Sequence, residues 1–273
     1  MKIYDSAVKQ TPVSSQVKAI YESRDLLRIL VARDLTVRYK RSVIGIWWSL
    51  LNPIFTTGVL FYVFNTVFKA RMADGTSFLP YLLSGVLLMT FFNQGLTMAA
   101  DSIANGSGVL TKVYVRPEVF AASATISSSI NFCFGLVPLT VVLLITGKHP
   151  GMKAPLVLVV MFFLILLTVG MSLFMAVAYI SFDDSKSLIA ILLLMLQYMT
   201  PVFYPISVLG PHTLRVIKLN PLTAFLTVFR DVFGNNGSAT LGTWAYMVAS
   251  SLVIFIGGLY FFMRKWPKVV AKI

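Results

Sequence analysis

The stretch PLVLVVMFFLILLTVGMSLFMAVAYI, residues 155–180, decides the fold class of this chain. It contains no Lys, Arg, Asp, Glu or His, and it is longer than the roughly 20 apolar residues that an α-helix needs to cross a bilayer. The stretch therefore predicts a membrane-spanning α-helix.

Other parts of the chain repeat this pattern. A shorter apolar run at 188–204 carries Pro201, and we count it as a span as well. Together these runs predict an all-α polytopic membrane protein with six transmembrane helices. The four remaining segments of sufficient length and apolar character are residues 43–68, 78–100, 119–146 and 243–263.

The overall composition agrees with a membrane protein and argues against a soluble one. Of the 273 residues, 57% are hydrophobic and only 12% are charged, whereas soluble domains carry about 25% charged residues. A single soluble core would also be near its practical limit of roughly 250–300 residues. The lone Cys133 cannot form an internal disulfide, and His149 and His212 lie in predicted loops, so we expect no metal site.

The positive charge predicts the orientation of the chain. The net charge is +13, and 16 of the 23 Lys and Arg residues lie on the side that holds both termini when six spans are counted. An excess of Lys and Arg marks the cytoplasmic side of a membrane protein, so both termini are predicted to be cytoplasmic. The charge suits anionic lipids better than nucleic acid. We divide the chain into an N-terminal cytoplasmic segment (1–42), a transmembrane domain (43–263) and a cytoplasmic tail (264–273).

Residues 22–41 predict a helix that lies on the cytoplasmic membrane surface. Leu26, Leu27, Leu30 and Val31 share one face of this helix. Asp34 and Arg38 have the spacing of an i,i+4 ion pair. The cations that would lie at headgroup level, just before the first span, are Arg38, Lys40 and Arg41.

The segment between the last two spans, residues 205–242, has a different character. It is rich in Pro and Gly, and its apolar part, residues 221–233, contains Arg230 and Asp231. That part is too short and too polar to cross the bilayer alone. A re-entrant or interfacial helical hairpin fits it, because broken backbone is tolerated at membrane depth where protein or water satisfies it. An ordinary extramembrane loop is the alternative.

The cytoplasmic connector DSIANGSGVLTKVYVRPE, residues 101–118, follows the second span. Gly106 and Gly108 loosen it, and the residues after them can form a short amphipathic helix that ends at Pro117, which suits the first turn of the next helix. Such a helix could be a docking site for a soluble partner, and a simple connector is the alternative.

Several kinds of chemistry are missing from the sequence. It has no G-x-x-x-x-G-K-[ST] loop for ATP, no H-E-x-x-H, no C-x-x-C and no G-x-S-x-G. Ionisable residues are nearly absent from the predicted spans, which argues against a proton-coupled carrier and a membrane-embedded enzyme. The chain is therefore predicted not to be an enzyme, to carry no cofactor, and either to take energy from a partner or to conduct passively.

Aromatic residues crowd the first, second and fifth predicted spans. Interfacial belts explain many of them. Aromatic rings also stack on the apolar faces of sugars, so an aromatic-lined conduit would suit a glycan. The candidate lining residues are Trp47, Phe55, Tyr62, Phe92, Tyr198, Phe203 and Tyr204.

Four motifs together resemble a known family, the permease subunits of ABC-2-type polysaccharide exporters. Its members export O-antigen, capsule, teichoic acid and related cell-envelope glycans. The resemblance covers roughly residues 20–265. The motifs are RYKRSVIGIWWSLLNP (38–53), KVYVRPE (112–118), TPVFYP (200–205) and LNPLTAFLTVFRD (219–231).

The resemblance implies a half-transporter in the bacterial cytoplasmic (inner) membrane. Two copies of the chain would pair with two ATPase subunits that hold ATP and Mg, and the substrate would be a lipid-linked polysaccharide. Export of a drug or small lipid is the alternative within the ABC-2 class, and a passive channel or a scaffold without an ATPase is the alternative outside it. A membrane-embedded transferase is a weaker alternative.

The resemblance also assigns roles to particular residues. The aromatic residues named above would line the channel. A cation cluster at headgroup level could also contact the pyrophosphate of the lipid carrier, with Arg38, Lys40 and Arg41 as the candidates, and a plain membrane anchor is the alternative for this cluster. Coupling to the ATPase would fall on Leu110, Lys112, Tyr114, Arg116, Pro117 and Glu118. The outer gate would be formed by Pro205, Pro221, Phe225, Phe229 and Arg230.

Overall fold

The computed structural model describes residues 23–40, 42–67, 77–105, 117–147, 149, 151, 153–182, 184–233 and 239–270. All regular elements in these ranges are helical, which confirms the predicted all-α class. The longer ones are α2 (Arg24–Tyr39), α3 (Trp48–Tyr62), α4 (Phe78–Asn105), α6 (Pro117–Ile145), α7 (Val157–Ser181), α8 (Ser185–Met199), α9 (Pro211–Leu219), α10 (Pro221–Val232) and α11 (Leu241–Val270).

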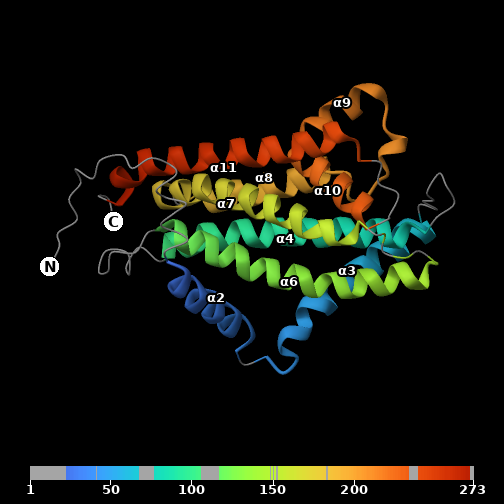
Figure 1. The fold of residues 1–273 in the computed structure, drawn as a ribbon, viewed down its shortest axis with the longest axis horizontal. Coiled ribbons are helices and arrows are strands. Elements are labelled where there is room, and N and C mark those ends of the chain that lie inside the picture. Colours follow the sequence, from blue (N-terminus) through green and yellow to red (C-terminus); the bar gives the residue numbers. More distant parts are fainter. Residues whose placement is uncertain are drawn as a thin grey trace.

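The long helices form a bundle whose axes run roughly parallel to one another (Figure 1). The closest pairs are α7 with α11 and α4 with α6, and α4 also packs on α7. Helices α2 and α3 form a V along one side of the bundle, whereas α9 and α10 lie at the end opposite the C-terminal part of α11 (Figure 1). The core lies between α4, α6, α7 and α10.

Four helices are long and apolar enough to cross a membrane, which confirms four of the predicted spans. They are Phe78–Ala104, Pro117–Ile145, Ala154–Ser181 and Leu241–Trp266. Helix α8 is apolar but shorter.

The predicted first span, residues 43–68, is not one continuous helix. It is divided into the 3-10 turn η1 (Gly45–Trp47), α3 and the π-helical turn η2 (Val63–Val67). Gly45 has φ 58°, a conformation that glycine adopts readily, and its N–H donates to Ser42 Oγ at 3.0 Å. After this turn α3 begins at Trp48, five residues later than the apolar run in the sequence.

Helix α2 confirms the helix predicted at residues 22–41. Leu30 is buried, and Leu26 and Leu27 pack against the same apolar cluster, which includes the first turns of α6. The apolar face that the sequence predicted is therefore the face that α2 turns toward the bundle.

The i,i+4 ion pair predicted between Asp34 and Arg38 is wrong. Asp34 instead pairs with its neighbour Arg33, with 3.1 Å between Nη2 and Oδ1. The guanidinium of Arg38 donates to the sulfur of Met98 on α4. The Arg38 side chain therefore reaches α4, where it lines the pocket described below.

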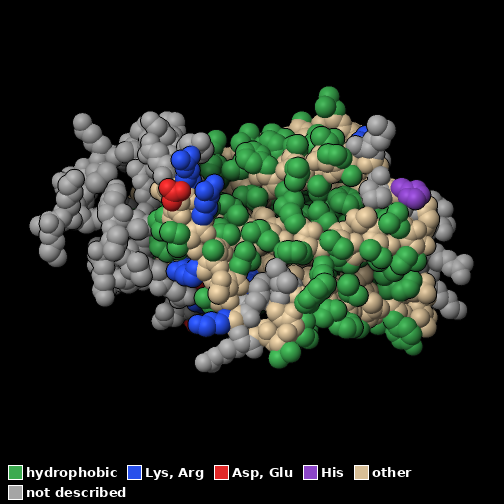
Figure 2. All heavy atoms as spheres, turned by 60° about the horizontal axis from the view of Figure 1, so that its bottom comes forward, with side chains coloured by type: hydrophobic (Ala, Val, Ile, Leu, Met, Phe, Trp, Pro, Cys, Tyr) green, Lys and Arg blue, Asp and Glu red, His purple; other side chains and the backbone are tan. Residues whose placement is uncertain are grey.

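Charged side chains gather toward one end of the bundle. In Figure 2 most of the visible Lys and Arg side chains lie at the left, and hydrophobic side chains cover the middle of the face. Asp101 lies near the C-terminal end of α4, and its Oδ1 is 2.8 Å from Lys186 Nζ. Lys186 precedes the predicted span at 188–204, and this hydrogen bond and the charge of Asp101 raise the pKa of Lys186.

Asn220 sets the start of α10. Its Oδ1 accepts from Leu222 N–H at 3.0 Å, and its Nδ2 donates to Thr200 Oγ1 at 2.9 Å. Pro221 follows as the first helical residue, where its missing N–H costs nothing. Asn220 therefore both caps α10 and ties it to the end of α8.

Asn220→Ala is expected to lower the free energy of unfolding by about 1–3 kcal/mol, because it removes a helix cap and leaves a buried hydroxyl with one partner fewer. The measurement is the thermal midpoint of the purified chain in detergent. The exposed Thr213→Ala on α9 is the control. Equal midpoints for the two variants would contradict the capping role.

Candidate functional site

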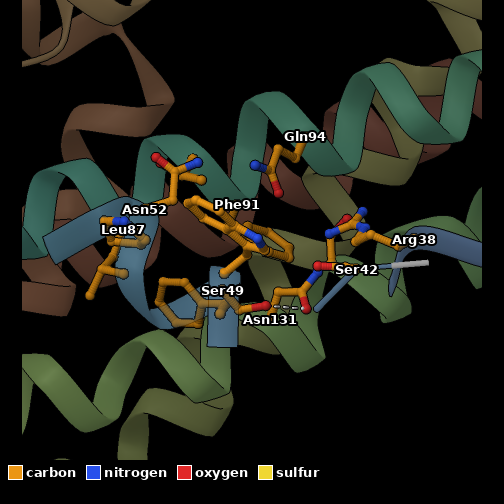
Figure 3. A pocket seen from close by; sticks show the side chains of 13 residues that line it. Arg38, Ser42, Ser49, Asn52, Leu87, Phe91, Gln94 and Asn131 are labelled. Carbon is orange, nitrogen blue, oxygen red and sulfur yellow. Dashed lines mark hydrogen bonds between the residues drawn. The ribbon is translucent and has the colours of Figure 1, made fainter. Parts of the chain in front are cut away.

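A cavity of about 240 Å³ lies between the C-terminal end of α2 and helices α3, α4 and α6. Figure 3 shows Arg38 at one end of this pocket and Leu87 at the other, with Gln94 and Phe91 between them. Its lining is mixed, with hydroxyl and carboxamide groups, one cation and aromatic rings. The main polar lining residues are Arg38, Ser42, Ser49, Asn52, Gln94 and Asn131.

Hydrogen bonds orient the carboxamides of the pocket. Ser49 Oγ donates to Asn131 Oδ1 at 3.1 Å and so links α3 to α6. Thr56 Oγ1 donates to Asn52 Oδ1 at 3.2 Å, one turn along α3. These two bonds occupy amide oxygens, and the NH₂ group of Asn52 makes no hydrogen bond to any described residue.

Arg38 is the charged residue of the lining. The last turn of α2 places it there, and Met98 Sδ, a weak acceptor, is its hydrogen-bond partner among the described residues. The lining contains no Asp or Glu. The pocket therefore combines one positive charge with uncharged donors and acceptors, and it lacks a negative charge.

At two positions the aromatic residue that lines the pocket is the sequence neighbour of the predicted one. Trp48 and Phe91 line the pocket, together with Phe132 of α6. Trp47 is 63% exposed, and Phe92 is fully buried in the core. At this place Phe91, and not the predicted Phe92, is the ring that lines the pocket.

A pattern in the sequence could have found the correct residues. Leu87, Thr90, Phe91 and Gln94 follow the i, i+3, i+4, i+7 spacing of one helix face. The polar members of that face distinguish it from the neighbouring face, which carries Phe92 and faces the core.

The other predicted lining aromatics lie apart from this pocket. Phe55, Tyr62 and Tyr198 are exposed, with more than half of each side chain accessible. Phe203 packs against Phe64 and Tyr198, with ring centroids 6.4 and 5.7 Å apart. Tyr204 belongs to the same end of the bundle, because its carbonyl accepts from Tyr81 Oη at 2.8 Å.

Arg230 is the centre of a second polar cluster, which the sequence did not predict. It is 3% exposed, and its guanidinium donates to Ser84 Oγ (3.2 Å), Pro201 O (3.0 Å) and Tyr81 O (2.9 Å). The guanidinium carbon also lies 3.3 Å from the centroid of the Tyr81 ring. We call Tyr81, Ser84, Pro201 and Arg230 the arginine clamp, because it joins α10 to α4 and to the turn after α8.

The clamp needs a small residue beside it. A Cβ on Gly85 would lie 2.9 Å from Val202 Cγ1 and 3.0 Å from Arg230 Nη2. No described Asp or Glu forms an ion pair with Arg230. The cation is therefore stabilised by neutral oxygens and by an aromatic ring in a tightly packed place.

The remaining residues predicted at the outer gate lie on α10 and just before η4. Phe225 and Phe229 of α10 are fully buried in the core, Pro221 begins α10, and Pro205 precedes the 3-10 turn η4 (Ile206–Val208). They lie at one end of the bundle and do not line the pocket.

The family described as ABC-2 type transporter matches residues 25–233, a range that contains both the pocket and the arginine clamp. The chain belongs to the ABC-2 type transporter family. This confirms the family that the four sequence motifs indicated.

Relatives of this ABC-2 chain carry names from glycan export. The O-antigen export system permease protein RfbA of Myxococcus xanthus is 27% identical over 219 residues, 80% of this chain and 83% of that protein. The protein of the same name from Klebsiella pneumoniae is 23% identical over 244 residues, 88% of this chain and 92% of that protein. The polysialic acid transport protein KpsM of Escherichia coli is 21% identical over 203 residues, 74% and 78% of the two chains.

The residues predicted to couple this ABC-2 chain to an ATPase are mostly not described by the structure. Leu110, Lys112, Tyr114 and Arg116 lie outside the described residues, and so does Arg41. Pro117 begins α6, and Glu118 is buried in the first turn of that helix, where an acidic side chain is favourable. Lys40 is exposed at the end of α2.

Proposed function

We propose that this chain is the transmembrane subunit of an ATP-driven exporter that moves a lipid-linked polysaccharide across the bacterial cytoplasmic membrane. The family match over residues 25–233 carries the proposal, together with relatives named for O-antigen and polysialic acid. The pocket adds support, because aromatic rings, carboxamides and a cation are groups that bind glycans and their phosphates.

The proposed topology has six spans with both termini in the cytoplasm. The transmembrane domain, residues 43–263, would use α3 with η2 as its first span and α8 as its fifth. Helices α9 and α10 would be re-entrant, since α10 has only 12 residues and carries two charged side chains, Arg230 and Asp231. The Lys and Arg side chains at one end of the bundle support a cytoplasmic position for that end (Figure 2).

The working assembly would contain two copies of this chain and two copies of a separate ATPase. ATP and Mg would bind to the ATPase subunits, and this chain would carry no cofactor. ATP-driven closure of those subunits would move the connector 101–118 and, through it, α4 and α6. This arrangement accounts for a transporter sequence without a nucleotide-binding loop.

In this mechanism different regions of the chain act at different depths. The cations at the end of α2, Arg38, Lys40 and Arg41, would hold the anionic carrier of the lipid-linked glycan at headgroup level. The aromatics of α3, α4 and the end of α8 would provide stacking surfaces along the path. The residues predicted at the outer gate would hold α9 and α10 in place until the glycan passes.

A direct test is glycan display by cells that lack the native exporter and receive this chain with the ATPase from the same gene neighbourhood. We expect glycan at the cell surface only when both proteins are present and the ATPase is active. Display without the ATPase would favour the passive channel. Export of a labelled drug or small lipid without glycan display would favour the other ABC-2 alternative.

Tyr114→Ala and Arg116→Ala are expected to reduce ATP-dependent glycan display at least tenfold, because these residues would transmit the motion of the ATPase. The same cells are assayed for the amount of chain in the membrane and for co-purification of the ATPase. Lys218→Ala on α9 is the control, since it removes a positive charge at the other end of the bundle. Unchanged display in both connector variants would exclude them from coupling.

A further inference from the structure

The pocket between α2, α3, α4 and α6 presents hydrogen-bond donors that the protein does not use. Arg38 has five N–H donors, and its hydrogen bond among the described residues goes to the sulfur of Met98. The carboxamide of Gln94 makes no hydrogen bond to a described residue, and Figure 3 shows it between Arg38 and Phe91. The NH₂ group of Asn52 is likewise unused.

The acceptors of the same pocket are all uncharged. The amide oxygens of Asn52 and Asn131 already accept from Thr56 and Ser49. The lining contains no carboxylate, which is the acceptor that could hold two hydroxyl groups of a neutral sugar at once. The one charged group of the lining is therefore a cation without a carboxylate beside it, so an anion would gain a charge-assisted hydrogen bond that a neutral sugar would not.

We propose that this pocket binds an anionic, oxygen-rich group of the substrate, a phosphate or a carboxylate, with Arg38 as its ion partner and Gln94 and Asn52 as donors. The proposal rests on the exporter function above and deepens it. It assigns the first recognition of substrate to its charge rather than to its sugar sequence. Gln94 is then a residue that determines specificity, because its replacement by a carboxylate would weaken the binding of an anion.

Two sources of such an anion are chemically possible. The phosphate groups of the lipid carrier would bring the anion to the pocket whatever the glycan is. A carboxylated sugar would do so only for an acidic glycan. The two sources share the same contacts with Arg38 and Gln94, so they are separated by the choice of probe.

The experiment measures binding to the full-length chain in nanodiscs of phosphatidylcholine, which contain no anionic lipid to compete. The probes are farnesyl pyrophosphate and, as its neutral match, farnesol, and a trimer of sialic acid and, as its neutral match, maltotriose. We expect at least one anionic probe to bind with a Kd at least tenfold lower than that of its neutral match. Binding of the anionic probe should weaken as salt is added.

Variants then test the residues. Arg38→Gln and Gln94→Glu are each expected to raise the Kd of the anionic probe at least tenfold, because a hydrogen bond to a charged group is lost or a negative charge is introduced. Arg38→Lys keeps the charge and should retain part of the affinity, which also shows that the site is folded. Arg28→Gln removes the same charge from an exposed position on α2 and should change the Kd less than twofold.

The outcomes separate this proposal from the function on which it rests. If the variants raise the Kd of farnesyl pyrophosphate alone, the lipid carrier is supported as the source of the anion. If they raise the Kd of the sialic acid trimer alone, the carboxylated sugar is supported as the source. Equal Kd values for anionic and neutral probes, or values within twofold of wild type in both Arg38→Gln and Gln94→Glu, overturn the anion site. Failure of wild-type glycan display with intact anion binding would overturn the exporter function and leave the site standing.

Discussion

Arg230→Met is expected to lower the thermal midpoint of the detergent-purified chain by about 10 °C or more. The substitution keeps an unbranched side chain but removes three hydrogen bonds, to Ser84 Oγ, Pro201 O and Tyr81 O. It also removes the cation from the face of the Tyr81 ring. A buried acceptor that loses its donor costs about 1–3 kcal/mol, so the whole change should cost about 3–5 kcal/mol.

The size of this effect follows from where the acceptors lie in the chain. Two of them belong to α4 and one to the turn after α8, so a single side chain holds three segments together. Water does not reach the site, because Arg230 is 3% exposed. Replacement by Lys would keep the charge, but an ammonium lacks the planar fork that reaches all three acceptors. The thermal midpoint of Arg230→Lys should therefore lie between those of wild type and Arg230→Met.

The control for this prediction is Arg215→Met on the neighbouring helix α9, where the side chain is exposed. Its midpoint should stay within 2 °C of wild type, a shift of roughly 1 kcal/mol or less for a chain of this size. Midpoints are measured by size-exclusion chromatography after heating. Equal thermal midpoints for Arg230→Met and Arg215→Met would show that the arginine clamp does not stabilise the fold.

Gly258→Ala is expected to destabilise the chain strongly even though it adds one methyl group. A Cβ on Gly258 would lie 2.8 Å from the carbonyl carbon and 2.9 Å from the Cα of Gly170 on α7. In return, a Cβ on Gly170 would lie 2.6 Å from Ile254 O of α11. Because these neighbours are backbone atoms, no side-chain rotation can relieve the overlap. The helices must move apart, at a cost of about 3 kcal/mol.

The adjacent residue gives a matched control. A Cβ on Gly257 would find Phe174 Cζ at 3.9 Å, which is ordinary van der Waals contact. Gly257→Ala should therefore leave the midpoint unchanged or raise it slightly, because Ala is the better helix former by about 1 kcal/mol. Gly258→Ala should lower the midpoint by roughly 6–12 °C. Similar midpoints for the two variants would show that α7 and α11 are not held together by this close approach.

The sequence predicted part of the candidate site and missed the rest for identifiable reasons. It singled out Arg38, which lines the pocket, because a cluster of basic residues directly before an apolar run places positive charge at headgroup level. It did not single out Gln94, although the polar face of α4 with i, i+3, i+4, i+7 spacing carries this residue, and it missed Asn52, because a single carboxamide in an apolar helix has no spacing signature. Phe203 and Tyr198 contact each other but do not line the pocket. Their aromatic character alone could not indicate this, because it does not say which residues they pack against.

By itself, the sequence determined that this chain is an all-helical membrane protein of the ABC-2 family, because apolar length and short motifs are local properties of the chain. It placed four spans correctly for the same reason. Only the tertiary structure decided that Trp48 and Phe91 face the pocket and that Trp47 and Phe92 do not, because neighbours on a helix point about 100° apart and packing sets the rotation. It also decided the role of Arg230, whose partner Tyr81 lies 149 residues away in the sequence.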